Sequence, residues 1–364
     1  MSYRGEIALI ANNSGRYFAE GVAGELGIHL IDAEDRDFED SEGRCVIGEN
    51  VRGRDVYVIQ CFQNLENKRV KSFAGNEYYT VNDNFMYMLT AIDAASRAIA
   101  GSITAVVLPF PYQRQDAQFK IQSPDEKHQR EGITASLVPK FLKTAGANYI
   151  MTLSLHARQI RGYADSGMGF EDLSFRPVAV DYIKDNHPEL VTENTSLLSP
   201  DPGGAGRARA YAARLGLLVY GQPKPGKPIM SLPTVIGDKE RVHKEENLVD
   251  SIELIGNVEG RDVLAVDDII GSGSTIVALG KECRDRGARS MQCLCTYAQL
   301  TGRAEELLGE LYEDGFLSGV FASNAIRHGK TFDWLEEIPV EPLIAKAIDK
   351  INKEESISEL TLRA

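Results

Sequence analysis

The stretch from Asp262 to Thr275, with the sequence DVLAVDDIIGSGST, constrains the fold more than any other part of the chain. Val263 to Val266 form a short apolar run without a helical stripe, which predicts a buried parallel strand. The paired acids Asp267 and Asp268 stand at the end of this strand, where open α/β sheets place their ligands. A loop of small residues, Gly271 to Thr275, then leads into an apolar helical pattern. The stretch therefore predicts a strand–loop–helix unit with a ligand at the carboxyl end of the strand.

The residue types in this unit suit a sugar phosphate. Small side chains let backbone N–H groups and hydroxyls close around a phosphate at a helix N-terminus, where the helix dipole favours an anion. The paired carboxylates can accept ribose hydroxyls or hold Mg²⁺. A glycine-serine loop alone is often only a turn, but the buried strand and the two acids favour a ligand site. The unit is similar to the ribose-phosphate motif of the phosphoribosyltransferase superfamily, which indicates the ligand without choosing the reaction.

Strand-like and helix-like patterns alternate along the rest of the chain. Strands are predicted at residues 6–10, 29–31, 44–47, 56–60, 103–108, 149–153, 196–198, 263–266, 291–296 and 319–322. Helices are predicted between most of them, for example at 19–26, 132–145, 177–185 and 204–215, and Asn82-Asp83-Asn84 is predicted to cap a helix over 85–100. This alternation predicts an α/β fold of parallel sheets flanked by helices on both faces.

Length and composition narrow the class of protein. The 364 residues leave room for two medium domains, and 43% hydrophobic residues suffice for their cores. We expect a first domain over residues 1–160 and a second over 161–364, with a C-terminal helix that can pack back on the first. The formal charge of −13 argues against nucleic acid as a partner, and no apolar run approaches a membrane span. Five cysteines without regular spacing predict free thiols in a reducing cytoplasm.

Two loops that follow predicted strands of the first domain carry candidate nucleotide contacts. In residues 109–116, PFPYQRQD, Arg114 offers a planar cation to a phosphate and Gln115 offers an amide to a base or ribose edge. Taken alone, such a loop is more often a solvated turn. His156 follows the strand predicted at 149–153 and is placed to serve as a metal ligand or an acid–base group. The alternative is a histidine satisfied by a backbone partner.

Two further loops belong to the second domain. Asp201 follows a predicted strand in the loop SPDPGG, where it can bind Mg²⁺ or a sugar hydroxyl or can simply shape a turn. Lys239 and Arg241 are two residues apart, so on an extended segment both point to the same side and can reach one phosphoryl group. The alternative for this charged segment is a solvated loop.

Together, and in this order, these loops resemble those of the ribose-phosphate pyrophosphokinase family, in its phosphate-dependent class. The matching residues are Phe38, Asp40 and Glu42; Asn50 to Val56; Asn82 to Asn84; Pro111 and Tyr112 with Arg114 to Asp116; His156, Gln159, Ile160 and Gly162; Ser199 to Asp201 with Gly203 and Gly204; Lys239 and Arg241; and Asp267 to Thr275. One such motif is weak, but the full set in family order is specific. Ordinary phosphoribosyltransferases carry only the last motif.

The resemblance implies two similar Rossmann-like domains of the phosphoribosyltransferase type, assembled as dimers that build a hexamer. It also implies transfer of the pyrophosphoryl group of MgATP to O1 of ribose 5-phosphate with release of AMP, and phosphate as an activator. Implied ATP contacts are Phe38, Asp40 and Glu42 from a neighbouring subunit, with Arg114, Gln115 and Asp116. Implied contacts to ribose 5-phosphate are Asp201, Asp267, Asp268, Gly271, Ser272, Gly273, Ser274 and Thr275. Lys239, Arg241 and His156 are the implied catalytic residues, and His156 and Asp201 the implied Mg²⁺ ligands.

The chain departs from the family pattern at one position that matters for the metal. The family's Asp-Leu-His reads Ser154-Leu155-His156 here, so one expected carboxylate is missing, and Asp165 is a candidate to compensate for it. Ser154 therefore keeps open a second hypothesis, a non-catalytic subunit that binds nucleotide and assembles with a true synthetase. A third hypothesis, a phosphoribosyltransferase that consumes the activated sugar, predicts no ATP loop. The segments around Phe38 and Arg114 argue against it.

Overall fold

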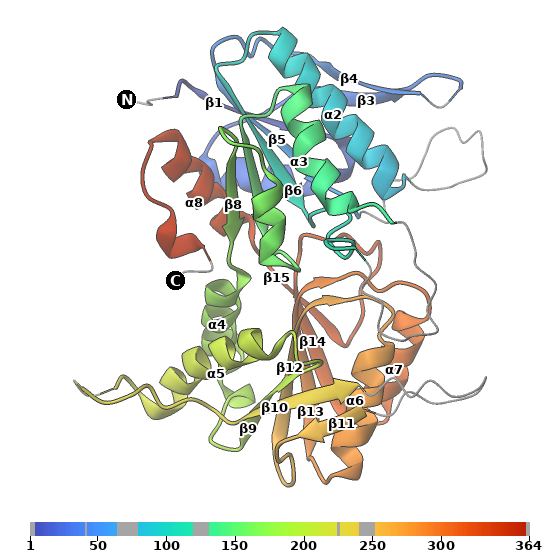
Figure 1. The fold of residues 1–364 in the computed structure, drawn as a ribbon, viewed down its shortest axis with the longest axis vertical. Helices are drawn as coiled ribbons and strands as arrows, with labels where there is room; N and C mark the ends of the chain where they lie inside the picture. Colours follow the sequence, from blue (N-terminus) through green and yellow to red (C-terminus); the bar gives the residue numbers. More distant parts are fainter. Residues whose placement is uncertain are drawn as a thin grey trace. The chain divides into compact units, whose positions relative to one another are not determined.

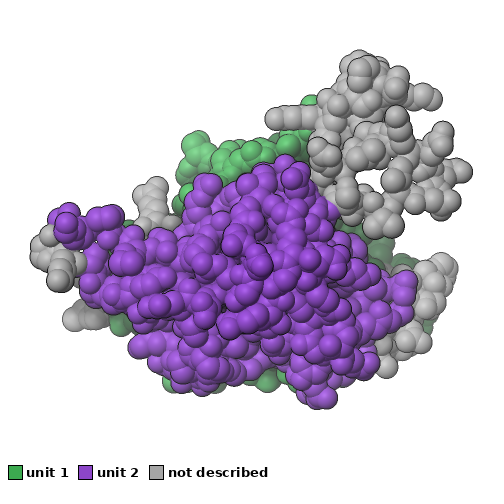
Figure 2. Space-filling view, turned by 90° about the horizontal axis from the view of Figure 1, so that it is seen from below, with its two compact units in different colours: residues 1–174, 325–329, 339–364 green, residues 175–324, 330–338 purple. Residues whose placement is uncertain are grey.

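The computed structural model describes residues 4–40, 42–63, 79–118, 131–223, 226–239 and 252–361. The chain divides into two compact units, coloured separately in Figure 2. The first unit comprises residues 1–174, 325–329 and 339–364, and the second comprises 175–324 and 330–338. The division thus falls after Ser174, later than the boundary expected at residue 160, because the strand at 169–173 pairs with the strand at 149–153.

The first unit contains a six-stranded parallel sheet in the order β2-β1-β5-β6-β7-β8. Its strands are β1 (Ile7–Ala11), β2 (Leu30–Ile31), β5 (Asp55–Cys61), β6 (Ser102–Leu108), β7 (Tyr149–Leu153) and β8 (Gly169–Leu173). Helices α2 (Val81–Arg97) and α3 (Thr134–Ala145) pack together on one face, while α1 (Arg16–Leu26) and α8 (Glu341–Asn352) pack together on the other (Figure 1). An antiparallel ribbon joins β3 (Ala33–Asp37) to β4 (Gly43–Ile47).

The second unit contains a seven-stranded sheet in the order β11-β10-β9-β12-β13-β14-β15, in which only the pairing of β10 with β11 is antiparallel. Its strands are β9 (Thr195–Ser199), β10 (Thr234–Lys239), β11 (Ile252–Ile255), β12 (Asp262–Ile270), β13 (Ser290–Ala298), β14 (Leu317–Ser323) and β15 (Leu335–Ile338). Helices α4 (Phe175–Asn186) and α5 (Ala205–Tyr220) contact each other, as do α6 (Ser274–Asp285) and α7 (Ala304–Glu313) (Figure 1). Both units therefore confirm the predicted α/β fold.

The strands form where the sequence is apolar on both sides of the chain, as expected when helices cover both faces of a parallel sheet. All seven residues of β5 are buried, for example. All five cysteines are buried free thiols, which confirms the prediction made for them. Among the described residues, no helix is both long and apolar enough to cross a membrane.

Helix α2 begins earlier than the sequence suggested. Asn82 to Asn84 were expected to cap a helix starting at Phe85, but the helix starts at Val81 and its N-cap is Thr80. The Thr80 side chain accepts the Asp83 N–H, and the Asp83 carboxylate accepts the Thr80 N–H at 2.7 Å, so two otherwise free helix N–H groups are satisfied reciprocally. This capping box moves the helix start and leaves Asn82 inside the first turn.

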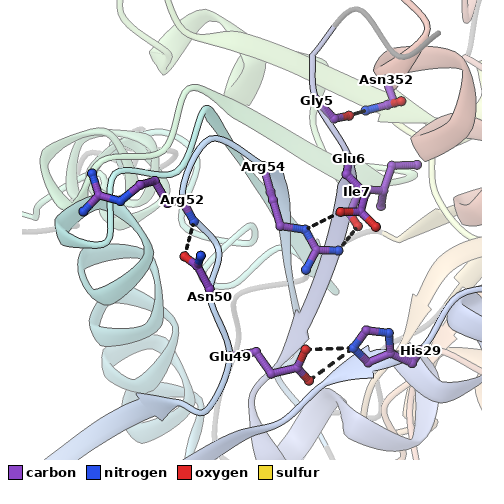
Figure 3. A network of polar contacts seen from close by, with 9 residues as sticks. All are labelled: Gly5, Glu6, Ile7, His29, Glu49, Asn50, Arg52, Arg54 and Asn352. Atoms are coloured by element: carbon purple, nitrogen blue, oxygen red, sulfur yellow. Dashed lines mark hydrogen bonds and ion pairs between the residues drawn. The ribbon is translucent and has the colours of Figure 1, made fainter.

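Helix α8 is fastened to the amino-terminal edge of the first sheet. The Asn352 amide donates to the Gly5 carbonyl at 3.0 Å (Figure 3). It also donates to Asp55 Oδ2 at 2.9 Å. Burial raises the pKa of Asp55, and the hydrogen bonds from Asn352 and Tyr57 act against that shift. Arg54 donates to the Ile7 carbonyl at 2.7 Å in the same region (Figure 3). The C-terminal helix is therefore a structural part of the first unit.

Candidate active site

The paired acids lie near the carboxyl end of β12, within the strand itself. The strand was expected to end at Val266, but it continues to Ile270 because it pairs with β13 as far as Ala298. Pairing with β9 on the other side stops at Ala265. Asp267 and Asp268 therefore sit where β12 extends beyond β9, at the edge where a parallel sheet opens to a ligand.

Arg207 of α5 forms an ion pair with both acids. Its Nη1 atom lies 3.1 Å from Asp267 Oδ1 and 3.2 Å from Asp268 Oδ1. Burial, followed by the neighbouring carboxyl of Asp268, raises the pKa of Asp267 to about 8, and Arg207 acts in the opposite direction. Sequence reasoning did not assign a role to Arg207, because a basic residue in the first turns of a helix has no mark that separates it from a surface arginine.

The small-residue loop leads into α6 as predicted. The helix begins at Ser274, and its N-cap is Gly273, whose φ of 74° is in the left-handed region that favours glycine. No side chain among the described residues caps this N-terminus, so the first N–H groups of α6 are open to an anion. The hydroxyls of Ser272 and Ser274 are exposed and lie 3.0 Å apart. The loop therefore has the donors that a phosphate requires.

Asp201 lies at the same edge of the second sheet. It follows β9, the strand beside β12, and it is exposed. Its Oδ1 atom accepts the Gly204 N–H at 2.8 Å, so part of this carboxylate shapes the turn before α5. Lys239 is the last residue of β10, on the other side of β9. The Lys239 side chain and all of Arg241 lie outside the described residues.

In the first unit, Arg114 to Asp116 and His156 follow the adjacent strands β6 and β7. The side chains of Arg114 and His156 are exposed. Gln159 joins the two loops by donating to Asp116 Oδ2 at 2.6 Å, and the Gln115 amide donates to Glu131 at 3.2 Å. The predicted nucleotide-contacting loops therefore meet at the carboxyl-terminal edge of this sheet.

Phe38, Asp40 and Glu42 lie at the tip of the β3–β4 ribbon. The Phe38 ring is 49% exposed, with the Arg44 guanidinium 4.9 Å from its centroid. Asp40 and Glu42 are also exposed, and the Glu42 N–H donates to Asp40 Oδ1 at 3.1 Å. The structure thus presents these residues at the exposed tip of the β3–β4 ribbon.

The structure does not bring Asp165 to His156. Asp165 precedes β8 and lies 3.6 Å from Lys143, near the last turn of α3. His156 instead follows the opposite end of β7, the strand that pairs with β8 in parallel. Among the described residues, no group of three or more histidine, cysteine, aspartate or glutamate side chains is arranged to hold a metal ion.

A mostly parallel sheet whose central strand carries paired acids, followed by a small-residue loop at the N-terminus of a helix, defines a protein of the phosphoribosyltransferase type. Family comparisons agree: residues 179–309 match the phosphoribosyl transferase domain, and residues 7–146 match the N-terminal domain of ribose phosphate pyrophosphokinase. The chain belongs to the ribose-phosphate pyrophosphokinase family. It is accordingly a transferase of diphosphate groups, and its family functions in nucleotide biosynthesis.

Relatives match along the whole chain. The ribose-phosphate pyrophosphokinase of Aquifex aeolicus (strain VF5) is 33% identical over 355 residues, covering 97% of this chain and 98% of the relative. That of Thermosipho africanus (strain TCF52B) is 31% identical, covering 98% of each chain. The crystal structure of phosphoribosylpyrophosphate synthetase from Mycobacterium smegmatis is 28% identical with a TM-score of 0.77, covering 96% of this chain and 99% of that one. The phosphate-dependent class remains a prediction.

Proposed function

We propose that the enzyme transfers the β,γ-pyrophosphoryl group of MgATP to O1 of ribose 5-phosphate, forming 5-phosphoribosyl 1-pyrophosphate and AMP. The observation that carries this proposal is the acid pair Asp267–Asp268 beside the uncapped N-terminus of α6, in a chain whose relatives bear the enzyme's name over their full length. An acid pair suits the hydroxyls of a ribose, and open helix N–H groups suit its 5-phosphate.

In this proposal the second unit binds the sugar phosphate. The backbone and hydroxyls of residues 271–275 bind the 5-phosphate, while Asp267 and Asp268 accept the ribose hydroxyls. Asp201 reaches the same ligand from the end of the neighbouring strand. Lys239 and Arg241 then stabilise the negative charge on the transferring group, which is the main demand of phosphoryl-type transfer.

The carboxylates of this edge also fit Mg²⁺. A mostly buried acid whose pKa is raised by burial and by a second acid gains from a nearby divalent cation, and carboxylate oxygens are the ligands that Mg²⁺ prefers. Asp201 and His156 remain the proposed ligands, whereas Asp165 is engaged by Lys143. When bound with the nucleotide, Mg²⁺ would neutralise charge on the phosphoryl oxygens.

In this proposal the first unit binds the nucleotide. Arg114 offers an exposed guanidinium to the ATP phosphates, Gln115 and Asp116 offer polar edges, and His156 approaches the metal-bound phosphates. Phe38, Asp40 and Glu42 fit the adenine of a neighbouring subunit, because the half-exposed Phe38 ring at the tip of the ribbon can stack on a base. This assignment requires a homo-oligomer, and the family resemblance implies one built from dimers.

The alternative of a non-catalytic subunit is not favoured. Relatives that cover 97–98% of the chain carry the name of the enzyme. A phosphoribosyltransferase is disfavoured as well, because the first unit matches the N-terminal domain of ribose phosphate pyrophosphokinase.

The test is to incubate the purified chain with ribose 5-phosphate, MgATP and phosphate and to measure AMP and phosphoribosyl pyrophosphate together. We expect equal amounts of both products, and a fall of roughly 10²–10³ in rate for Lys239→Ala. Lys184→Ala, which removes an exposed lysine of α4 in the same unit, is the matched control and should keep the wild-type rate. Absence of turnover with ATP still bound would overturn the proposal, and Ser154→Asp would then test the missing acid.

A further inference from the structure

The turn that carries His156 is held by two buried side chains from other segments. Asp172 of β8 is 1% exposed, and its Oδ1 atom accepts the Leu155 N–H at 3.1 Å. Gln113, 4% exposed in the loop after β6, accepts the His156 N–H through Oε1 at 2.9 Å. The backbone N–H groups of Leu155 and His156 are therefore held by side chains from two other segments, β8 and the loop after β6.

The same turn has an unfavourable backbone geometry. Ser154 has φ of 48°, in the left-handed region that a residue with a Cβ atom seldom occupies. Such a conformation is unfavourable and persists only where the surroundings determine it. The hydrogen bonds to Leu155 and His156 are local contacts able to offset this cost.

Each of the two anchoring side chains also has a buried polar atom without a hydrogen-bond partner among the described residues. Asp172 Oδ2 and Gln113 Nε2 are buried and make no hydrogen bond among the described residues. A buried polar atom without a partner destabilises the fold, so two of them beside one turn would be unfavourable if their only role were stability. Apolar residues of similar shape would cost less. A function at the turn accounts for the polar pair.

We propose that Asp172 and Gln113 are positioning residues that hold His156 in place for the pyrophosphoryl transfer. This inference rests on the proposed function. It also brings a carboxylate to the turn in which the family pattern has one. Position 154 carries serine, and Asp172, which pairs with Thr152, reaches the Leu155 N–H from the adjacent strand. Asp172 acts here through the backbone, and the exposed His156 side chain is the group that contacts the substrate.

The first experiment compares Asp172→Ala with Asp172→Asn. Asparagine keeps an acceptor for the Leu155 N–H, whereas alanine removes it. We expect Asp172→Ala to lower kcat/KM for ATP by about 10- to 100-fold, as small displacements of a reacting group do, and to leave KM for ribose 5-phosphate unchanged. Asp172→Asn should restore most of the activity. Gln113 gives a second pair of variants. Gln113→Met removes the acceptor and should lower kcat/KM for ATP as Asp172→Ala does, whereas Gln113→Glu keeps the acceptor and should retain most of the activity.

Asp55→Ala is the matched control for a merely structural effect. Asp55 is also fully buried in the first sheet, and its Oδ1 atom likewise makes no hydrogen bond among the described residues, but it lies at the start of β5, at the opposite edge from His156. Its removal should lower the melting temperature without a selective loss of kcat/KM for ATP. An equal and selective loss in Asp55→Ala would overturn the inference.

A double-mutant cycle with His156→Ala tests whether the anchors act through the histidine. If they do, Asp172→Ala has little further effect once the imidazole is gone. Full additivity, or wild-type kinetics in Asp172→Ala, would overturn the inference while leaving the proposed function intact. If the wild type makes no product, the proposed function fails, and amide exchange still tests the anchor: Leu155 should exchange faster in Asp172→Ala and remain protected in Asp172→Asn. Unchanged exchange in Asp172→Ala would overturn it.

Discussion

Arg207 and Asp267 are joined by an ion pair of 3.1 Å between Nη1 and Oδ1, and the same guanidinium nitrogen lies 3.2 Å from Asp268. One cation on α5 thus balances two adjacent carboxylates on β12. Arg207 lies outside the motif at residues 262–275. The charge of the sugar site therefore depends on a residue that the motif does not contain.

Removing this cation should weaken the enzyme's use of ribose 5-phosphate. Arg207 lowers the pKa of Asp267, so Arg207→Ala raises that pKa further and leaves fewer ionised acids near neutral pH. We expect kcat/KM for ribose 5-phosphate to fall by roughly 30-fold, about 2 kcal/mol. We also expect the acidic limb of the pH profile of kcat/KM to move to higher pH. Arg207→Lys keeps the charge and should shift the limb less. A pH profile identical to the wild type in Arg207→Ala would contradict this role.

Binding of the sugar phosphate should release a proton. With the pKa of Asp267 raised to about 8, the acid pair holds a proton at neutral pH in the free enzyme, and a ligand or Mg²⁺ that prefers the ionised pair displaces it. Calorimetric titrations in buffers of different ionisation enthalpy should show release between about pH 6 and 8 that disappears above about pH 9. Asp267→Asn should abolish the release. Uptake of a proton, or none at any pH, would contradict the prediction.

The N-cap of α6 should tolerate only glycine well. Gly273 has φ of 74°, and a Cβ atom there would meet Ala304 Cα at 3.4 Å. Gly273→Ala should cost about 1–2 kcal/mol of unfolding free energy from the left-handed conformation and raise KM for ribose 5-phosphate by moving the phosphate-binding N–H groups. Gly302→Ala is the control, because Gly302 has φ of 63° but open space around it. It should lose similar stability by thermal denaturation and keep its KM.

The sequence predicted those strands that are apolar throughout. Residues 149–153 were assigned correctly because YIMTL is buried on both faces of the sheet. Strand β8, with the sequence GFEDL, was missed because two acids, Glu171 and Asp172, are unusual in a buried strand. The structure explains Asp172, which accepts the Leu155 N–H of the neighbouring turn. Strand β15, LEEI, was missed for a similar reason: it is an edge strand, and Glu336 pairs with His187 at 2.8 Å.

Some residues of the candidate site could likewise be predicted from the sequence, and others could not. The motif around Asp267 could be identified from sequence because its residue types and their spacing are local. Arg207, Gln113 and Asp172 could not, because each acts on residues more than 15 positions away through contacts that only the packed sheet creates.

The attachment of α8 gives a prediction about stability alone. Asn352 donates to the Gly5 carbonyl and to Asp55 Oδ2, so Asn352→Ala leaves a fully buried carboxylate with one fewer donor. We expect a loss of about 1–3 kcal/mol in unfolding free energy, the range for a buried group deprived of its partner. The loss should grow as pH rises above the ordinary range of an aspartate, because the pKa of Asp55 is raised by burial and its ionised form needs the donor most.

Lys353→Ala is the control, because Lys353 is the next residue and is exposed. It should change stability by less than about 0.5 kcal/mol. Denaturant unfolding at several pH values measures both variants, and equal stability of the two would show that Asn352 does not hold the helix.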